Sequence, residues 1–180
     1  MKKAILLLLK GTICFLAVVF WTSAIRAANP ATINVTVTIQ NLSVSATGPI
    51  AFGTVVASSL TVSSDSSRVV NDGNVTETFW LMLTNPGGWT AVQAAPVAEQ
   101  YCLSAQFNSN KPTAVSFTYA NHALSTTSTA SSASKFAGDQ TGLSVSATGG
   151  RNLWLKFEAP SSTTVTTQQT IVVTVTAAAG

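Results

Sequence analysis

Few residues in this sequence of 180 residues have side chains suited to acid–base or nucleophilic chemistry. The sequence contains one histidine, His122, and six carboxylates. The carboxylates are scattered, so no two are close enough in sequence to nominate a general acid and a general base. Serine is abundant, but no Gly-x-Ser-x-Gly segment presents one as a nucleophile. The sequence therefore predicts a protein that is not an enzyme.

The same shortage of ligands argues against a metal or another cofactor. A metal site usually gathers three or four His, Cys or carboxylate ligands, and His122 has none nearby in sequence. We expect His122 to be a solvent-exposed loop residue. The oxygen-rich segment Asn71-Asp72-Gly73-Asn74 lacks the spacing of a calcium-binding EF-hand, which would place Arg68 at the first ligand position. A turn between two strands accounts for this segment.

Residues 1–27 have the pattern of a secretory signal peptide. Lys2 and Lys3 precede an apolar stretch that ends at Trp21 and is interrupted by Lys10. A retained membrane anchor is the alternative, but a span needs about 20 apolar residues and Lys10 divides the stretch. We therefore expect cleavage after Ala24 or Ala27, no membrane insertion after cleavage, and export to the periplasm, the cell surface or the medium.

Loss of this leader changes the charge of the protein and its cysteine content. Four of the nine basic residues lie in the leader, which leaves five against six acidic residues, or a net charge of −1. Without a cluster of Lys and Arg, neither nucleic acid nor anionic lipid is an expected partner. Cys102 is the one cysteine that remains, so it cannot form an intrachain disulfide, and its role stays open.

Alternation of apolar and polar residues is the main structural signal. Thr32–Gln40 alternates strictly, Gln169–Ala177 alternates except at Val172, and further short runs of this kind are separated by turn residues. The sequence is 46% hydrophobic and 8% charged, which excludes a disordered chain, and it lacks the composition of a long helix. We expect residues 28–180 to form a single all-β domain, an antiparallel β-sandwich or a barrel.

Two segments resemble a known family. Ile50-Ala51-Phe52-Gly53-Thr54-Val55 is followed by a Ser-rich stretch and by Val69-Val70 running into the Asn71–Asn74 turn. This order resembles the immunoglobulin-like modules of the ASPM–SPD-2–Hydin type and similar bacterial surface repeats, over residues 50–85. The resemblance implies an immunoglobulin-like sandwich and brings no catalytic residues with it.

Residues 120–140 interrupt the strand pattern. Ser125–Ser134 consists almost entirely of Ser, Thr and Ala. The simplest interpretation is a flexible surface loop. The alternative is a glycosylated excursion or one that contacts a partner.

Several large side chains fall on the face opposite to the predicted core. Alternation places Trp80, Met82, Trp154 and Cys102 on this outer face of their strands. Large apolar groups in such positions are covered by a loop of the same chain, by another subunit or by a ligand such as a sugar ring. The sequence leaves these alternatives open.

The first predicted strand suggests a way to assemble. Thr32–Gln40 follows the leader directly, and its apolar residues are Ile33, Val35, Val37 and Ile39. Such a segment either completes its own sheet or adds to the sheet of a neighbour, as in donor-strand exchange.

These features favour an exported, non-catalytic structural or surface-assembly subunit. It would form a fibre or a layer by self-association or with other surface proteins. The alternative is an extracellular module that binds polysaccharide through outward-facing tryptophans.

Overall fold

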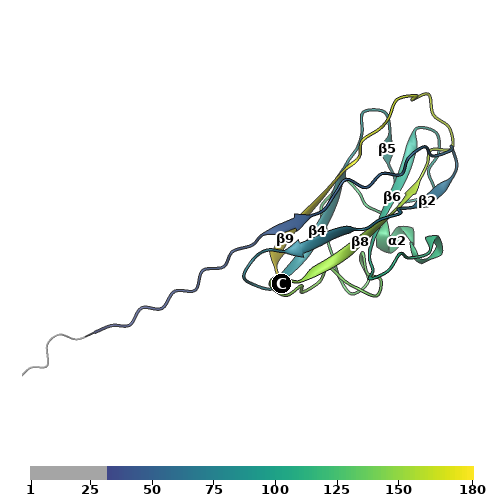
Figure 1. The fold of residues 1–180 in the computed structure, drawn as a ribbon. Helices are drawn as coiled ribbons and strands as arrows, with labels where there is room; N and C mark the ends of the chain where they lie inside the picture. The colour runs from purple at the N-terminus through teal and green to yellow at the C-terminus, as the bar shows by residue number, and fades with distance from the viewer. Residues whose placement is uncertain (1–31) are drawn as a thin grey trace, which may run out of the picture. The chain divides into compact units, whose positions relative to one another are not determined.

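The structure is a computed structural model that describes residues 32–180 (Figure 1). The predicted leader, residues 1–27, lies outside the described residues. The chain divides into two units, Met1–Thr38 and Ile39–Gly180, and the strands found in residues 32–180 lie in the second. Among the described residues, no helix is both long and apolar enough to cross a membrane.

The strands of the second unit form two antiparallel sheets, apart from one short parallel pair. The larger sheet has the strand order β1-β3-β8-β6-β5, and β2 also pairs with β8. The smaller sheet has the order β7-β4-β9. The bounds of the strands in the larger sheet are β1 Val44–Ala46, β2 Leu60–Val62, β3 Ser67–Asn71, β5 Thr90–Ala91, β6 Gln100–Phe107 and β8 Gly150–Glu158. Those in the smaller sheet are β4 Glu77–Thr84, β7 Thr129–Ala130 and β9 Val172–Ala179.

The core consists of the inward-facing side chains of both sheets, so the arrangement is sandwich-like. Alternate residues of β4, β6 and β8 are buried in one cluster: Phe79, Leu81, Leu83, Tyr101, Leu103, Ala105, Phe107, Leu153, Leu155 and Phe157. They lie on the face opposite to Trp80, Met82, Trp154 and Cys102, as alternation predicts, because side chains of a strand point to its two faces in turn. The predicted all-β sandwich is confirmed at this level.

The larger sheet is covered on its outer face by two short helices. The 3₁₀-helix η1 (Ala114–Ser116) and the α-helix α2 (Tyr119–His122) belong to a segment that packs over β6 and β8 (Figure 1). The Ser116 hydroxyl donates to Gln106 Oε1 at 3.0 Å, and the Tyr119 hydroxyl donates to Glu158 Oε2 at 2.7 Å. The sandwich therefore has a third, partial layer on this side.

The N-terminal part of the described chain differs from the predicted strand pattern. Residues 32–43 are in no strand, and the first strand starts at Val44. Residues 50–55, a further strand candidate in the sequence, are likewise in no strand. Alternation predicts which side chains can share a face, but a strand also needs a partner for its backbone, and these two segments have none within residues 32–180.

Candidate functional site

The side chains of the N-terminal segment, residues 32–40, are exposed. Their exposed fractions are 89% for Ile33, 80% for Val35, 79% for Val37 and 75% for Ile39. The segment follows an extended course in Figure 1. A row of four large apolar side chains in water is unfavourable, because burial of each one is worth about 1.5–3 kcal/mol. This segment is suited to a partner.

The base of this segment is held by the turn between β3 and β4. Asn74 accepts a hydrogen bond from the Asn41 N–H at 2.8 Å, and its Nδ2 donates to Ile39 O at 2.9 Å. The Ser43 N–H donates to the buried carboxylate of Glu77 at 2.8 Å. Residues 39–43 are thus fixed to one end of the sandwich. The turn that holds them contains Asn71–Asn74, the segment that the sequence predicted as a connection between strands.

The outer edge of β9 is unpaired. β9 pairs with β4 along its whole length, and no strand of residues 32–180 pairs on its other side. Because the backbone groups of an antiparallel strand alternate in direction, half of those in β9 point away from β4. Edge strands are usually protected by Lys, Pro or a bulge, but β9 contains no charged residue and no proline.

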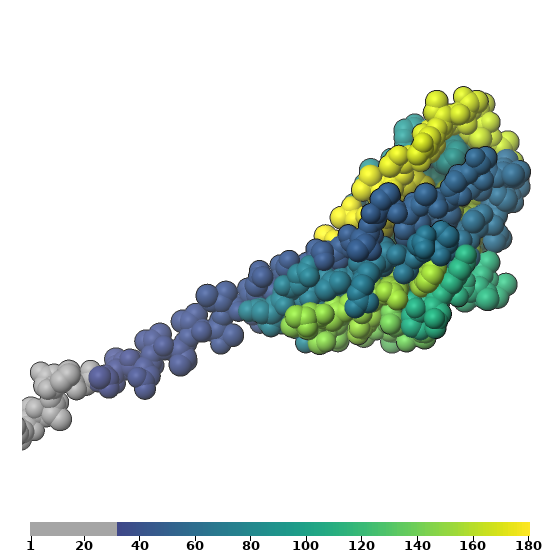
Figure 2. Space-filling model, in the orientation of Figure 1, coloured from purple at the N-terminus to yellow at the C-terminus, as the bar shows by residue number. Residues whose placement is uncertain are grey.

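Part of the core beside this edge is incompletely covered. Ile171, Val173, Val175 and Ala177 are half-buried and pack against the core from the β9 side. Val44, Ile50, Phe52 and Val55 are also half-buried and pack against the same core. Figure 2 shows the C-terminal strand at the surface, next to the dark-blue part of the chain that contains residues 48–55. We call this region, the free backbone edge of β9 with these eight side chains, the β9 edge.

Residues 48–55 contribute to the β9 edge without being fixed by hydrogen bonds. Their backbone and side chains make no hydrogen bond to another residue within 32–180. Phe52 nevertheless reaches the core, with its ring 5.6 Å from that of Phe157. Within the described residues, the segment is therefore held by side-chain packing.

The structure corrects the expectation that Trp154 and Cys102 point to the exterior. Both lie on the outer face of the larger sheet as predicted, but that face is covered: Cys102 is fully buried and Trp154 is 9% exposed. The indole Nε1 of Trp154 donates to Asn108 O at 3.0 Å. Burial raises the pKa of the Cys102 thiol, which keeps it protonated. Neither residue is available to a partner.

A buried polar cluster lies under the same cover. Lys156 Nζ is 2.7 Å from Glu158 Oε1, and both side chains are almost fully buried. Lys156 also lies over the rings of Phe117 and Tyr119, at 5.7 and 5.6 Å from their centroids. The hydrogen bond from Tyr119 to Glu158 and the burial of Tyr119 raise the pKa of its hydroxyl to about 12. Each charge is paired, so the cluster attaches the covering segment to the sheet.

His122 belongs to this cover, and the expectation that it is exposed is wrong. It is 5% exposed, its Nδ1 accepts the Thr118 N–H at 2.9 Å, and its Nε2 lies 3.0 Å from Ala137 O. Both ring nitrogens are therefore occupied by backbone groups. Around it, residues 120–140 contain further buried side chains, Leu124 and Phe136 among them. Within residues 32–180, no three His, Cys, Asp or Glu residues gather to hold a metal ion.

Trp80 and Met82 lie on the outer face of the smaller sheet. Trp80 is 37% exposed and Met82 is half-buried. Their neighbours across the ladder are Thr176 and Thr174 of β9. A single partly exposed indole on a threonine-rich face is a modest surface for stacking against a ligand.

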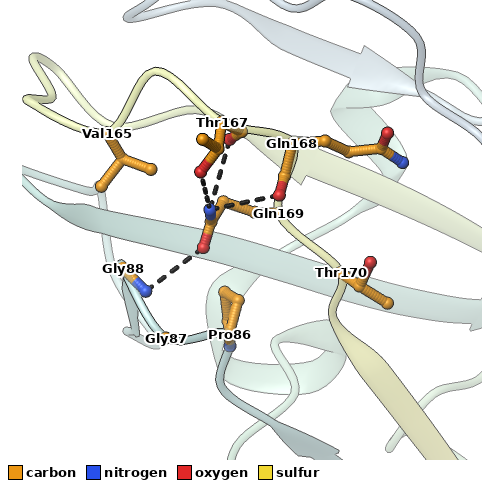
Figure 3. Close-up of a pocket in the computed structure, with 8 residues that line it drawn as sticks. All are labelled: Pro86, Gly87, Gly88, Val165, Thr167, Gln168, Gln169 and Thr170. Atoms are coloured by element: carbon orange, nitrogen blue, oxygen red, sulfur yellow. Dashed lines mark hydrogen bonds between the residues drawn. The ribbon is translucent and has the colours of Figure 1, made fainter.

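A surface pocket of about 590 Å³ lies at the opposite end of the smaller sheet from the Asn71–Asn74 turn (Figure 3). Its lining contains no charged or titratable side chain: Pro86, Gly87, Gly88, Val165, Thr167, Gln168, Gln169 and Thr170. The Gln169 amide is already used, since its Oε1 accepts the Gly88 N–H and its Nε2 donates to Thr167 O. The pocket offers no group for catalysis.

No family model matches this chain, and neither a curated protein nor a solved structure matches it.

Proposed function

We propose that the protein is an exported, non-catalytic structural subunit that assembles into a fibre or a layer by strand addition. The observation that carries this proposal is the row Ile33, Val35, Val37 and Ile39. These residues alternate strictly and are 75–89% exposed, and the segment has no partner strand within the described chain. Strand addition would pair its backbone and bury its apolar face in one step.

Two further features support the proposal. The resemblance of residues 50–85 to bacterial surface modules implies an immunoglobulin-like sandwich, a common scaffold for such subunits. The pattern of residues 1–27 implies export, after which the protein would meet other copies of itself at the cell surface.

A polysaccharide-binding module is the less favoured alternative. It would have used Trp80 and Trp154 together, but Trp154 is buried and donates its indole N–H to Asn108. Trp80 would have to provide the whole platform.

The proposal is tested by exchanging residues within the segment without changing its composition. In the variant V35T/T36V/V37T/T38V, two of the four apolar side chains move to the other face of the strand. The loss of two buried valines is worth about 3–6 kcal/mol, so this variant should remain monomeric where the wild type forms high-mass species. Light scattering after size exclusion and negative-stain imaging measure this outcome.

The matched control is V35I/V37I, which keeps the alternation and should assemble like the wild type. Assembly of the exchanged variant at wild-type concentrations would refute the proposal. A wild-type protein that stays monomeric at high concentration would do the same.

A further inference from the structure

We infer that the β9 edge is the acceptor for residues 32–40 of a second copy of this chain. The inference rests on the proposed function and deepens it, because it names the surface to which the segment adds. Each chain carries one donor segment, residues 32–40, and one β9 edge. Successive copies can therefore continue the assembly without limit.

The lengths of the edge strands favour β9. A nine-residue strand is about 30 Å long, and β9 with its eight residues offers about 27 Å of free backbone. The other edge strands among the described residues are much shorter: β1 and β2 have three residues each, and β5 and β7 have two each. None of these four can pair with more than a fraction of the segment.

The side chains at the β9 edge match those of the segment. A strand added next to β9 extends the smaller sheet, so one of its faces lies over the half-buried side chains of the edge. These side chains are all apolar, and neither residues 44–56 nor residues 171–180 include a charge. Residues 32–40 are equally uncharged and present their four apolar side chains on one face. Both surfaces are apolar, and the apolar side chains of residues 32–40 and those of residues 171–177 that pack against the core both recur at every second residue.

The base of the segment argues for a second copy in place of the same chain. Residues 39–43 are fixed at the β3–β4 turn, the end of the sandwich where β9 also ends, since the Gly180 N–H donates to Thr76 O. From there the chain continues into β1, which runs away from this end, so residues 32–38 could pair with their own β9 only through a tight reversal next to Ile39. Tight reversals favour Gly, Pro, Asn or Asp, and Thr36–Gln40 contains none of them.

The test uses the full-length V35T/T36V/V37T/T38V variant as a monomeric acceptor and a synthetic peptide of residues 32–40 as the probe. At a peptide concentration of about 100 Kd, amide exchange in residues 171–179 should slow by about 100-fold, while β5 and β7 are unchanged. A photoreactive residue at position 35 of the peptide should label residues 50–55 or β9. The control peptide carries the same four exchanges as the variant and should protect nothing.

The outcomes separate this inference from the proposed function. If the acceptor variant itself assembles, the proposed function fails. If that variant is monomeric but the peptide protects β1, β2, β5 or β7, or protects no strand, the β9 edge is not the acceptor and the proposed function stands. In wild-type assemblies made from mixed light and heavy isotope-labelled chains, cross-links confined to a single chain would also overturn the inference.

Discussion

At the scale of single residues, the best-defined polar interactions lie under the covering segment. Lys156 and Glu158 form a buried ion pair, and Tyr119 donates to the same carboxylate. A buried charge is costly when its partner is removed, even where the intact pair adds little. These residues are therefore expected to be sensitive to substitution although they take no part in the proposed function.

Replacement of Lys156 by Met should lower the free energy of unfolding by about 3–5 kcal/mol, because Glu158 would be left buried without a counter-charge. Urea unfolding measures the change. The control is Lys111→Met, a lysine at an exposed position, which should change stability by less than about 0.5 kcal/mol. Adding Glu158→Gln to Lys156→Met should recover part of the loss, and no recovery would contradict this account.

The two tyrosines should resist ionisation. Burial raises the pKa of Tyr101, and the hydrogen bond to Glu158 with partial burial raises that of Tyr119 to about 12, from an ordinary value of 10.0. Tyrosinate absorbance should therefore stay low near pH 10 in the folded protein but rise there in urea. Since both folded pKa values are raised, their contribution to stability is complete below pH 10 and is lost as the pH rises toward 12 and beyond.

Tyr119→Phe supplies the control for this titration. The step near pH 12 should disappear, and the later ionisation of Tyr101 should remain. A folded protein that titrates both hydroxyls near pH 10 would contradict the packing described for them.

At the scale of elements, alternation predicted which residues share a face but not what covers that face. In β6 and β8 the sequence placed Cys102 and Trp154 on the side opposite to the core, and the structure agrees on the side. Ser104, Gln106, Lys156 and Glu158 share that side, so it had the composition of a solvent-facing surface. The segment that covers this side contains the short helices η1 and α2, and a pattern of alternation does not predict such helices. Its aromatic residues Phe117 and Tyr119 were the signal in the sequence that it could pack against the sheet.

The extended segments show the converse limit. Thr32–Gln40 and Ile50–Val55 have good strand patterns, but within residues 32–180 neither is in a strand. Pairing depends on a neighbour that a local pattern does not specify. The four apolar residues of the first segment were nevertheless identified from the sequence, because their strict alternation directly after the leader was visible there. The β9 edge was not identified, since it needs the order of strands in the sheet.

The turn between β3 and β4 should not tolerate a side chain at position 73. A Cβ on Gly73 would overlap Asn41 O and Glu77 Oε1, the atoms next to the base of the donor segment. Gly73→Ala should lower the free energy of unfolding by about 1–3 kcal/mol and speed amide exchange at Asn41 and Ser43. Gly87→Ala is the control, because a Cβ there would meet nothing within 4 Å. Equal effects of the two substitutions would contradict this role of the turn.

At the scale of the whole molecule, the donor segment and the β9 edge leave each copy with two uncovered apolar surfaces. Four exposed side chains and eight half-buried ones would be covered on assembly. On the proposed assembly, the protein would fold as a monomer and reach its full stability when both surfaces are occupied. Its stability should therefore depend on ligands of the β9 edge and on protein concentration.

This dependence can be measured by thermal unfolding of the monomeric V35T/T36V/V37T/T38V variant with the 32–40 peptide. A ligand that binds the folded state at about 100 Kd adds about 2.7 kcal/mol to the free energy of unfolding. For a domain of this size that corresponds to a rise in Tm of about 5–10 °C. The peptide with the exchanged residues should give no rise, because its apolar side chains no longer share one face. An equal rise with both peptides would indicate nonspecific binding of an apolar sequence, and would leave the alternation of residues 32–40 without a role in stability.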